Sequence, residues 1–456
     1  MSSIATPETG VDEALDFRRI LPILIIVLID LLGLTIIIPL LPLYATSFGA
    51  NALWVGIIAT SYPLMQFIGA PLLGGLSDRF GRKPVLIISQ IGTFVGFIVL
   101  GFASSIPVLI LARLIDGISG ANISAAQAAL TDSTSERNRT QALGLLGAAF
   151  GLGFIIGPII AFIALGLSGN DYRVPAFVAA GFSLISVLLT AFWFKETLPV
   201  EKRNRNKQIG HERGLSRRIL NALRQPRTGI LLLLIFMQQI VFFGFENLVT
   251  LFTLNRLGMN ATSNTGLFIY VGILIVMVQG YYLGRWSKRF GERRLIMVGL
   301  ALLASGLILT AVTPAQPVPW YSRAALEAEL GQGDTSTSIQ LPDDTRTGWL
   351  GLAWLVVAMI PTSVGAGMLS PSINSLLTKS VADTEYGSIL GVSASLVSAA
   401  NAISPLIGGA LFEALGATAP FLIGGVLLFG MWVFVRGRIP EIPVSSAAAP
   451  AAQPGR

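Results

Sequence analysis

The sequence predicts an all-α membrane protein, and composition together with apolar runs leads to this class. The chain has 456 residues, a mean hydropathy of +0.72, 53% hydrophobic residues and 12% charged ones. An average soluble domain carries about 25% charged residues. Apolar runs of about 20 residues, the length that a bilayer-spanning helix requires, recur along the whole chain. We therefore expect a polytopic helical protein.

The apolar runs define twelve expected spans. They lie at roughly 20–45, 53–74, 84–103, 107–129, 142–166, 175–194, 228–252, 266–284, 293–313, 348–371, 387–411 and 418–437. With successive loops on alternate sides, 26 of the 31 Lys and Arg residues fall on one side. Because cytoplasmic loops are enriched in Lys and Arg, we expect both termini in the cytoplasm. This bias explains the net charge of +7 without a nucleic-acid partner.

A long basic segment divides the spans into two sets of six. The expected parts are a cytoplasmic N-terminal tail at 1–19, a six-helix half at 20–194, a cytoplasmic linker at 195–227, a second six-helix half at 228–437 and a cytoplasmic tail at 438–456. The second half contains an outer loop at 314–347, which is rich in acidic, Pro, Ser and Thr residues. We expect one short helix in this loop, at 323–330.

The two halves repeat one another in sequence. GGLSDRFG at 74–81 matches GRWSKRFG at 284–291, and TDSTSERNRTQALG at 131–144 aligns with TKSVADTEYGSILG at 378–391. The offset is larger for the second match, as expected if the long outer loop is an insertion between them. Two six-helix halves related by a parallel repeat are typical of secondary transporters.

The segment GGLSDRFGRK at 74–83 gathers charges in a hairpin between the second and third spans. Gly81 permits a tight turn, and Pro84 suits the first turn of the next helix. A carboxylate near a helix N-terminus is stabilised, and span eleven begins on the same side, near Gly387. We therefore expect Asp78 to latch the two halves together. The repeat has Lys288 at the matching position, so we expect the latch on one side only.

This hairpin resembles the signature loop of the major facilitator superfamily, G-x-L-a-D-r-x-G-r-k. The residues that fill the pattern here are Gly74, Asp78, Arg79, Gly81, Arg82 and Lys83. The resemblance implies twelve helices in the major facilitator fold, an outward-facing state favoured by the latch, and an Asp78 oriented by Arg82 and Asp132.

Three further stretches resemble the drug:proton antiporters of this superfamily. LARLIDGISG at 111–120 is similar to the span-four motif, and LIDLLGLTIIIPLLPLY at 28–44 to the span-one pattern. GAAFGLGFIIGP at 147–158 is similar to the antiporter motif of span five, formed here by Gly147, Gly151, Gly153, Gly157 and Pro158. PLMQFIGAPLLGGLSDRFGRKPVL at 63–86 resembles tetracycline efflux proteins in particular.

Ionisable residues inside the expected spans are candidates for proton coupling. They are Asp30, Arg113, Asp116 and Glu246. Each costs at least ~2.5–3.5 kcal/mol at mid-membrane on insertion scales. Asp30, Arg113 and Asp116 sum to one negative charge, so one proton makes them neutral. We expect Asp30 or Asp116 to carry a proton, with a structural Arg113–Asp116 ion pair as the alternative. Glu246 is expected to carry a second proton or to pair with a cationic drug.

Polar and aromatic residues in the spans are candidates for a substrate cavity. They are Tyr62, Gln66, Gln238, Gln239, Phe242, Phe245, Asn247 and Asn374. Amides would provide hydrogen bonds, and the aromatic rings an apolar, adaptable wall.

These features predict a proton-driven exporter of small amphipathic or cationic compounds, of the multidrug-efflux and antibiotic-resistance kind. We expect a monomer in the bacterial inner membrane, whose partners are the substrate, protons and lipid. Without Cys and with a single His, we expect no metal and no cofactor beyond the proton gradient. No nucleophile–base pair or phosphate loop indicates an enzyme.

Three alternatives remain open: a metabolite or lipid exporter, a tetracycline-specific exporter, and a non-transporting receptor or scaffold. Tetracycline efflux proteins usually have acidic residues in spans three and nine, which the expected spans 84–103 and 293–313 lack. We therefore favour multidrug efflux over tetracycline.

Overall fold

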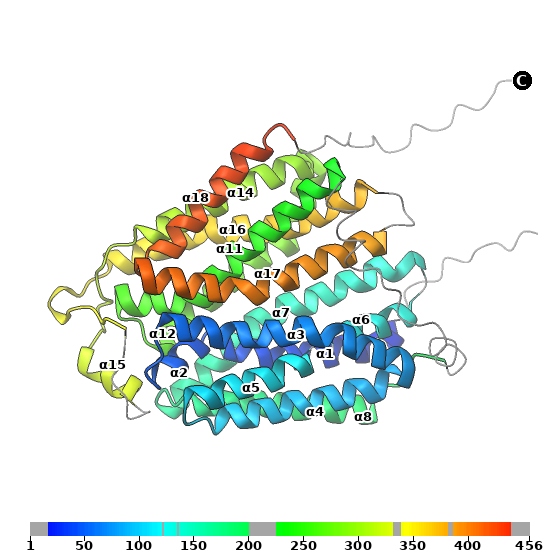
Figure 1. Cartoon of the computed structure of the whole chain (residues 1–456), viewed down its shortest axis with the longest axis horizontal. Helices are drawn as coiled ribbons and strands as arrows, with labels where there is room; N and C mark the ends of the chain where they lie inside the picture. Colours follow the sequence, from blue (N-terminus) through cyan, green and yellow to red (C-terminus); the bar gives the residue numbers. More distant parts are fainter. Residues whose placement is uncertain are drawn as a thin grey trace, which may run out of the picture.

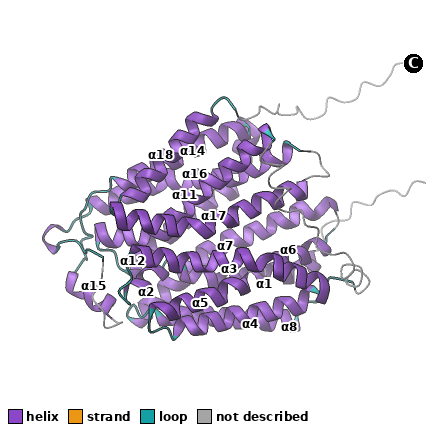
Figure 2. Cartoon of the chain, viewed as in Figure 1, coloured by secondary structure: helices purple, strands orange, loops and turns teal. Residues whose placement is uncertain are grey.

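The computed structural model describes residues 17–120, 123–134, 136–199, 225–331, 339–381 and 386–438. Over these residues the chain is helical and contains no strand (Figure 2). Eleven of the described helices are long and apolar enough to cross a membrane, and Ala419–Val435 is a shorter apolar helix. The predicted all-α membrane fold with twelve spans is confirmed.

The helices follow one another with short connections, except around α15 and between α8 and α11. In the first part of the chain they are α1 (Phe17–Ile37), α2 (Leu41–Thr46), α3 (Ala52–Phe80), α4 (Arg82–Gly101), α5 (Ile106–Ser119), α6 (Ile123–Asp132), α7 (Glu136–Ser168) and α8 (Arg173–Phe192). The second part contains α11 (Pro226–Leu257), α12 (Ala261–Met277), α13 (Leu283–Phe290), α14 (Glu292–Ala311), α15 (Arg323–Leu330), α16 (Leu350–Lys379), α17 (Tyr386–Leu415) and α18 (Ala419–Val435). The short helix expected at 323–330 is α15. Most of the expected linker at 195–227 lies outside the described residues.

Two expected spans, the first and the eighth, are not single continuous α-helices in the part of the chain that the structure describes. The first breaks after Ile37, because Pro39 lacks an N–H and the residue before a proline disfavours helical geometry; the chain resumes as α2. In the fourth, α5 and α6 lie on either side of residues 121–122, which are outside the described residues. The eighth contains one π-helical turn, Val278–Tyr282, between α12 and α13. Such turns often occur at functional sites.

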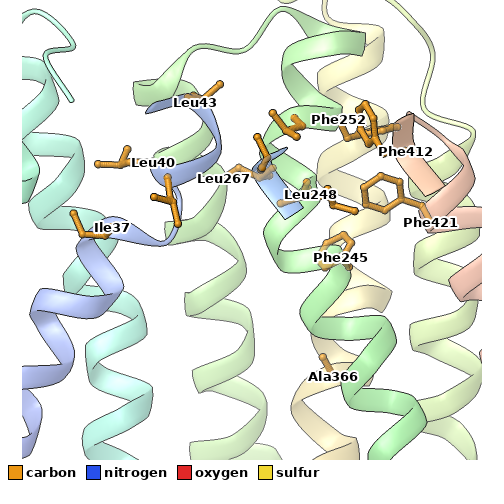
Figure 3. Close-up of a cluster of buried hydrophobic side chains, with 14 of the residues drawn as sticks. Ile37, Leu40, Leu43, Phe245, Leu248, Phe252, Leu267, Ala366, Phe412 and Phe421 are labelled. Atoms are coloured by element: carbon orange, nitrogen blue, oxygen red, sulfur yellow. The ribbon is translucent and has the colours of Figure 1, made fainter. Parts of the chain in front are cut away.

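The buried apolar residues form three clusters, and their distribution shows where the two parts of the chain meet. The largest cluster joins residues of both parts, among them Leu40 and Leu43 near α2 with Leu248 and Phe252 on α11 (Figure 3). The second cluster contains only residues from the first part, such as Ile20 on α1 and the buried residues of α6. The third cluster contains only residues from the second part.

These two smaller clusters lie toward the terminal side, by which we mean the side where α1 begins and α18 ends. The large shared cluster includes the opposite side, where α2 and α15 lie.

Helices α3 and α17, one from each part of the chain, also meet on the side opposite the termini. They pack closely at the side opposite the termini, where a Cβ on Gly56 would lie 2.5 Å from the Pro405 carbonyl oxygen. There the Ala52 amide donates to Glu413 Oε2 at 3.2 Å. In Figure 1 the two helices lie together at this end and diverge toward the other. The two parts of the bundle are therefore joined on one side and separated on the terminal side.

Candidate transport site

A cavity lined by polar and aromatic residues lies between the two parts of the chain. Its volume is about 360 Å³, within the range of small-molecule sites. Helices α7, α11 and α12 supply most of its wall. The lining includes three glycines, four amides and several aromatic rings: Gly147, Phe150, Gly151, Phe154, Gln238, Gln239, Phe242, Phe243, Phe245, Glu246, Phe268, Gly272, Gln279, Ser370 and Asn401. Among the described lining residues, Glu246 is the one charged side chain.

Helical periodicity explains which residues face this cavity. On α11, Gln238, Phe242, Phe245 and Val249 recur at the i, i+4, i+7 and i+11 positions of one face. Gln239 also lines the wall, where its Nε2 donates to Asn401 Oδ1 at 2.8 Å. The amide pair provides polar groups that hold their orientation beside the aromatic rings.

The structure does not place every predicted cavity residue here. The Asn247 side chain donates to the Phe243 carbonyl oxygen one turn back, at 2.8 Å. Asn374 accepts from Ser393 Oγ at 3.0 Å. Tyr62 and Gln66 lie in the first part of the chain, where Gln66 Nε2 donates to the Tyr62 hydroxyl at 3.2 Å. These four residues are outside the cavity lining.

Three of the four predicted intramembrane charges come together away from this cavity. Arg113 Nη1 donates to Asp116 Oδ2 at 2.7 Å, and both side chains are almost fully buried. The Arg113 guanidinium lies over the Tyr62 ring, 4.6 Å from its centroid. Asp30 and Asp116 line one small cavity with Tyr62. The fourth charge, Glu246, belongs to the large cavity, so the structure separates it from this cluster.

Close helix contacts around the charge cluster depend on glycine. A Cβ on Gly117 would lie 2.4 Å from the Tyr62 carbonyl oxygen, and one on Gly96 would lie 2.9 Å from Asp116 Cβ. Because glycine has no Cβ, α3, α4 and α5 can approach closely enough to bury the ion pair.

The glycines of α7 face two different neighbours. Gly153 and Gly157 pack on α1, where a Cβ on Gly157 would lie 2.1 Å from Thr35 Oγ1. Thr35 Oγ1 also donates to the Gly153 carbonyl oxygen at 2.9 Å. Gly147 and Gly151 line the cavity instead. Pro158 lies inside α7 without ending it.

The charged hairpin after α3 is tied to the next helices by Arg82. Its Nη1 donates to Asp78 Oδ1 at 2.7 Å, and its Nε to Asp132 Oδ2 at 3.0 Å. Gly81 has a φ of 106°, in the region that favours glycine. Lys83 Nζ donates to the Ala191 carbonyl oxygen. Arg79 is exposed, and a Cβ on Gly74 would meet only Ser124 Oγ, at 3.8 Å.

Two acidic residues that the sequence analysis did not single out also hold hairpins. Glu196 accepts from the backbone amides of Arg82 and Lys83, at the N-terminus of α4. Glu292 pairs with Lys379 and accepts from Ser287 Oγ. The expected latch partner, the start of α17 near Gly387, cannot be compared with Asp78, because side chains in α17 are described only from Ile389 onward.

The fold and the site define a polytopic helical protein with a solute-sized cavity between two bundles and a separate buried charge cluster in the first part of the chain. Residues 23–340 match the family model of the Major Facilitator Superfamily. The chain belongs to this superfamily, which is a family of transporters.

Curated relatives extend over nearly the whole chain. "Tetracycline resistance protein, class B" of Escherichia coli is 29% identical over 90% of this chain and 91% of its own length. "Multidrug resistance protein 2" of Bacillus subtilis is 25% identical over 89% and 91%.

Solved structures share the fold. The human organic anion transporter MFSD10 (TETRAN) superposes with a TM-score of 0.57 and 24% identity, covering 92% of this chain and 99% of that one. The nucleoside transporter NupG gives a TM-score of 0.64 at 15% identity, covering 92% and 99%.

Proposed function

We propose that the protein is a proton-coupled exporter of small amphipathic cations that works by alternating access. The superfamily supplies the transporter class, and relatives named for tetracycline and multidrug resistance support drug-like substrates. In this proposal the protein is a monomer of the bacterial inner membrane. The terminal side is cytoplasmic, so the structure corresponds to an inward-facing state.

The observation that carries the proposal is Glu246 in the aromatic cavity. Phe242, Phe243 and Phe245 are near it in sequence, and Phe150 and Phe268 complete the wall from α7 and α12. A carboxylate attracts a cation, and aromatic faces add cation–π attraction while accepting many shapes. An anionic substrate would find no positive side chain among the described lining residues.

The buried cluster of Asp30, Arg113 and Asp116 is the proposed proton site. Its formal charge is negative when all three are ionised, and one proton makes it neutral. Such a cluster is costly inside a membrane and is therefore a functional candidate by default. Its alternative role, a structural ion pair between Arg113 and Asp116, predicts that Asp30 can be neutralised without uncoupling transport.

A tetracycline-specific exporter is the second candidate, favoured by the relatives named for tetracycline resistance. The absence of acidic residues within α4 and beyond the first residue of α14 weighs against it, because a metal-chelated drug would lose carboxylate partners. A substrate panel separates the two candidates.

The test uses inverted membrane vesicles with an imposed proton gradient. The wild type is expected to accumulate several unrelated lipophilic cations, whereas Glu246→Gln accumulates them poorly but retains uptake of neutral drugs. Asp30→Asn is expected to lose gradient-driven uptake of all of them. Glu327→Gln, an exposed acidic residue on α15, is the matched control and should behave as wild type. Uptake of tetracycline alone would support the second candidate, and no uptake of any compound would contradict drug export.

A further inference from the structure

The outer-loop helix α15 docks on the closed side of the bundle. The Ser322 side chain caps the helix by accepting from the Ala325 amide. Two leucines of the helix, Leu326 and Leu330, are buried. The helix contacts α2, and it lies at the far left end of the molecule in Figure 1, away from the diverging ends of α3 and α17. The two buried leucines therefore anchor this loop helix of eight residues to the bundle.

Glu329 at the end of α15 binds groups from both parts of the chain. Its Oε1 accepts from the Tyr172 hydroxyl at 2.8 Å, and its Oε2 from Asn170 Nδ2 at 2.9 Å. From the second part, the Ala261 amide and Asn260 Nδ2 each donate at 3.5 Å. Tyr172 and Asn170 precede α8, whereas Asn260 and Ala261 begin α12. One carboxylate therefore bridges the two parts.

A direct contact accompanies this bridge. Thr262 Oγ1 donates to Asn170 Oδ1 at 2.5 Å, again joining the start of α12 to the loop before α8. Beside it, Trp320 Nε1 donates to Ser263 Oγ at 3.1 Å and holds the segment that leads into α15. Asn170, one of the donors to Glu329, is thus itself held by Thr262.

We propose that α15 is an external lid and that Glu329 is the residue that positions it, by clasping the outer ends of the two halves together in the inward-facing state. This proposal rests on the alternating-access part of the proposed function. To open the outer side, the loop before α8 must move away from the start of α12, and Glu329 cannot follow both. The clasp must therefore break once in each cycle, and its strength sets how often the outer side opens.

The environment of Glu329 differs between the two states. Burial raises the pKa of the Glu329 carboxyl above its ordinary value, and the hydrogen bonds from Tyr172, Ala261, Asn260 and Asn170 oppose this shift. Tyr172 is the titratable side chain in direct contact; the other donors are neutral. On opening, the carboxylate would become hydrated and lose these partners.

Distances between two spin labels test the proposal on purified protein without substrate. The chain has no Cys, so Leu167→Cys and Val312→Cys provide two labels at exposed positions near the outer ends of α7 and α14. Glu329→Ala is expected to raise the ratio of long to short distances roughly tenfold, as loss of several charge-assisted hydrogen bonds implies. Glu327→Ala is the matched control, because Glu327 lies on the same helix and pairs with exposed Arg323. An unchanged distribution in Glu329→Ala, or an equal shift in Glu327→Ala, overturns the proposal.

A second variant covers the case in which Glu329→Ala does not fold. Tyr172→Phe removes one donor from the first half and keeps the ring, which lies 5.7 Å from the Tyr44 ring. A smaller shift toward long distances is expected, and no shift contradicts the clasp. Label distances can be measured without transport. The lid proposal can therefore be refuted while drug export is confirmed, and drug export can be refuted while the lid proposal is confirmed.

Discussion

The two hairpins on the terminal side, α3–α4 and α13–α14, are alike in backbone and opposite in charge. Gly81 and Gly291 both have positive φ, 106° and 76°, and each precedes a helix. In the first hairpin the cation Arg82 binds the anion Asp132; at the aligned positions of the second, the anion Glu292 binds the cation Lys379. Ser77 and Ser287 hydrogen-bond to Arg82 and Glu292 respectively.

This inversion of charge distinguishes two roles of the charged residues in the first hairpin: tethering the hairpin to a neighbouring helix, and latching α17. Tethering a hairpin to the end of the neighbouring helix requires opposite charges but not a particular sign. Asp78 is different, because it also binds Arg82 and its aligned position holds exposed Lys288. A negative charge at this place is therefore specific to the first hairpin, as a latch on the N-terminus of α17 would require.

Removal of the central charge should have the largest effect in the first hairpin. Arg82→Ala leaves Asp78 and Asp132 without their cation, and we expect a loss of about 2–4 kcal/mol of stability. Glu292→Ala should cost about 1 kcal/mol, because its partner Lys379 is 48% exposed. Thermal unfolding of both variants in the same detergent measures the difference. Equal losses would mean that the two hairpins are equivalent.

Charge reversal should distinguish a tether from a latch. The double variant Glu292→Lys with Lys379→Glu restores an ion pair, and we expect stability within about 1 kcal/mol of wild type. The corresponding double variant in the first hairpin, Arg82→Glu with Asp132→Arg, should not regain wild-type stability, because Asp78 then faces a like charge. Unfolding midpoints of the single and double variants decide this; recovery in the first hairpin would argue against a separate role for Asp78.

Neutralising Asp78 should change conformation more than stability. Its side chain is 43% exposed here, so we expect Asp78→Asn to unfold near the wild-type temperature. If the carboxylate latches α17 in the outward-facing state, this variant should transport several-fold more slowly and stay inward-facing. Lys288→Gln is the control and should transport normally. Wild-type transport by Asp78→Asn, with unchanged access to the outer cavity, would exclude the latch.

The smallest effect should be a pH dependence on the outer side. Because the Glu329 pKa is raised when the clasp is closed, stabilisation of the closed state is complete below the ordinary carboxyl range. It declines as the pH rises through the raised pKa. Label distances should therefore shorten slightly on acidification, and Glu329→Ala should abolish this response. An equal response in that variant would assign it to another group.

The sequence predicts the membrane fold and the buried charges well, because both stand out against apolar surroundings. Asp30, Arg113 and Asp116 interrupt apolar runs, and the structure brings them together. The cavity wall is harder to predict. Phe150 and Phe268 look like any other apolar residues of a span, and only the rotation of α7 and α12 shows that they face the cavity.

Polar residues are ambiguous for a related reason. Asn247 was a reasonable cavity candidate, but its amide is satisfied by the carbonyl one turn back on α11. The sequence does not single out Glu329, because a carboxylate in an acidic loop is usually solvated and its four donors come from distant segments. Long-range contacts of this kind leave no periodic signal in the sequence.

The most direct test of the account is proton release on drug binding by purified protein in weakly buffered solution. The account assigns the drug cation to Glu246 and the exchanged proton to the cluster with Asp30. Wild type should release protons when a lipophilic cation binds, Asp30→Asn should bind the drug with little release, and Glu246→Gln should bind it weakly. Release by Asp30→Asn equal to that of wild type, with unchanged drug affinity in Glu246→Gln, would contradict this division of roles.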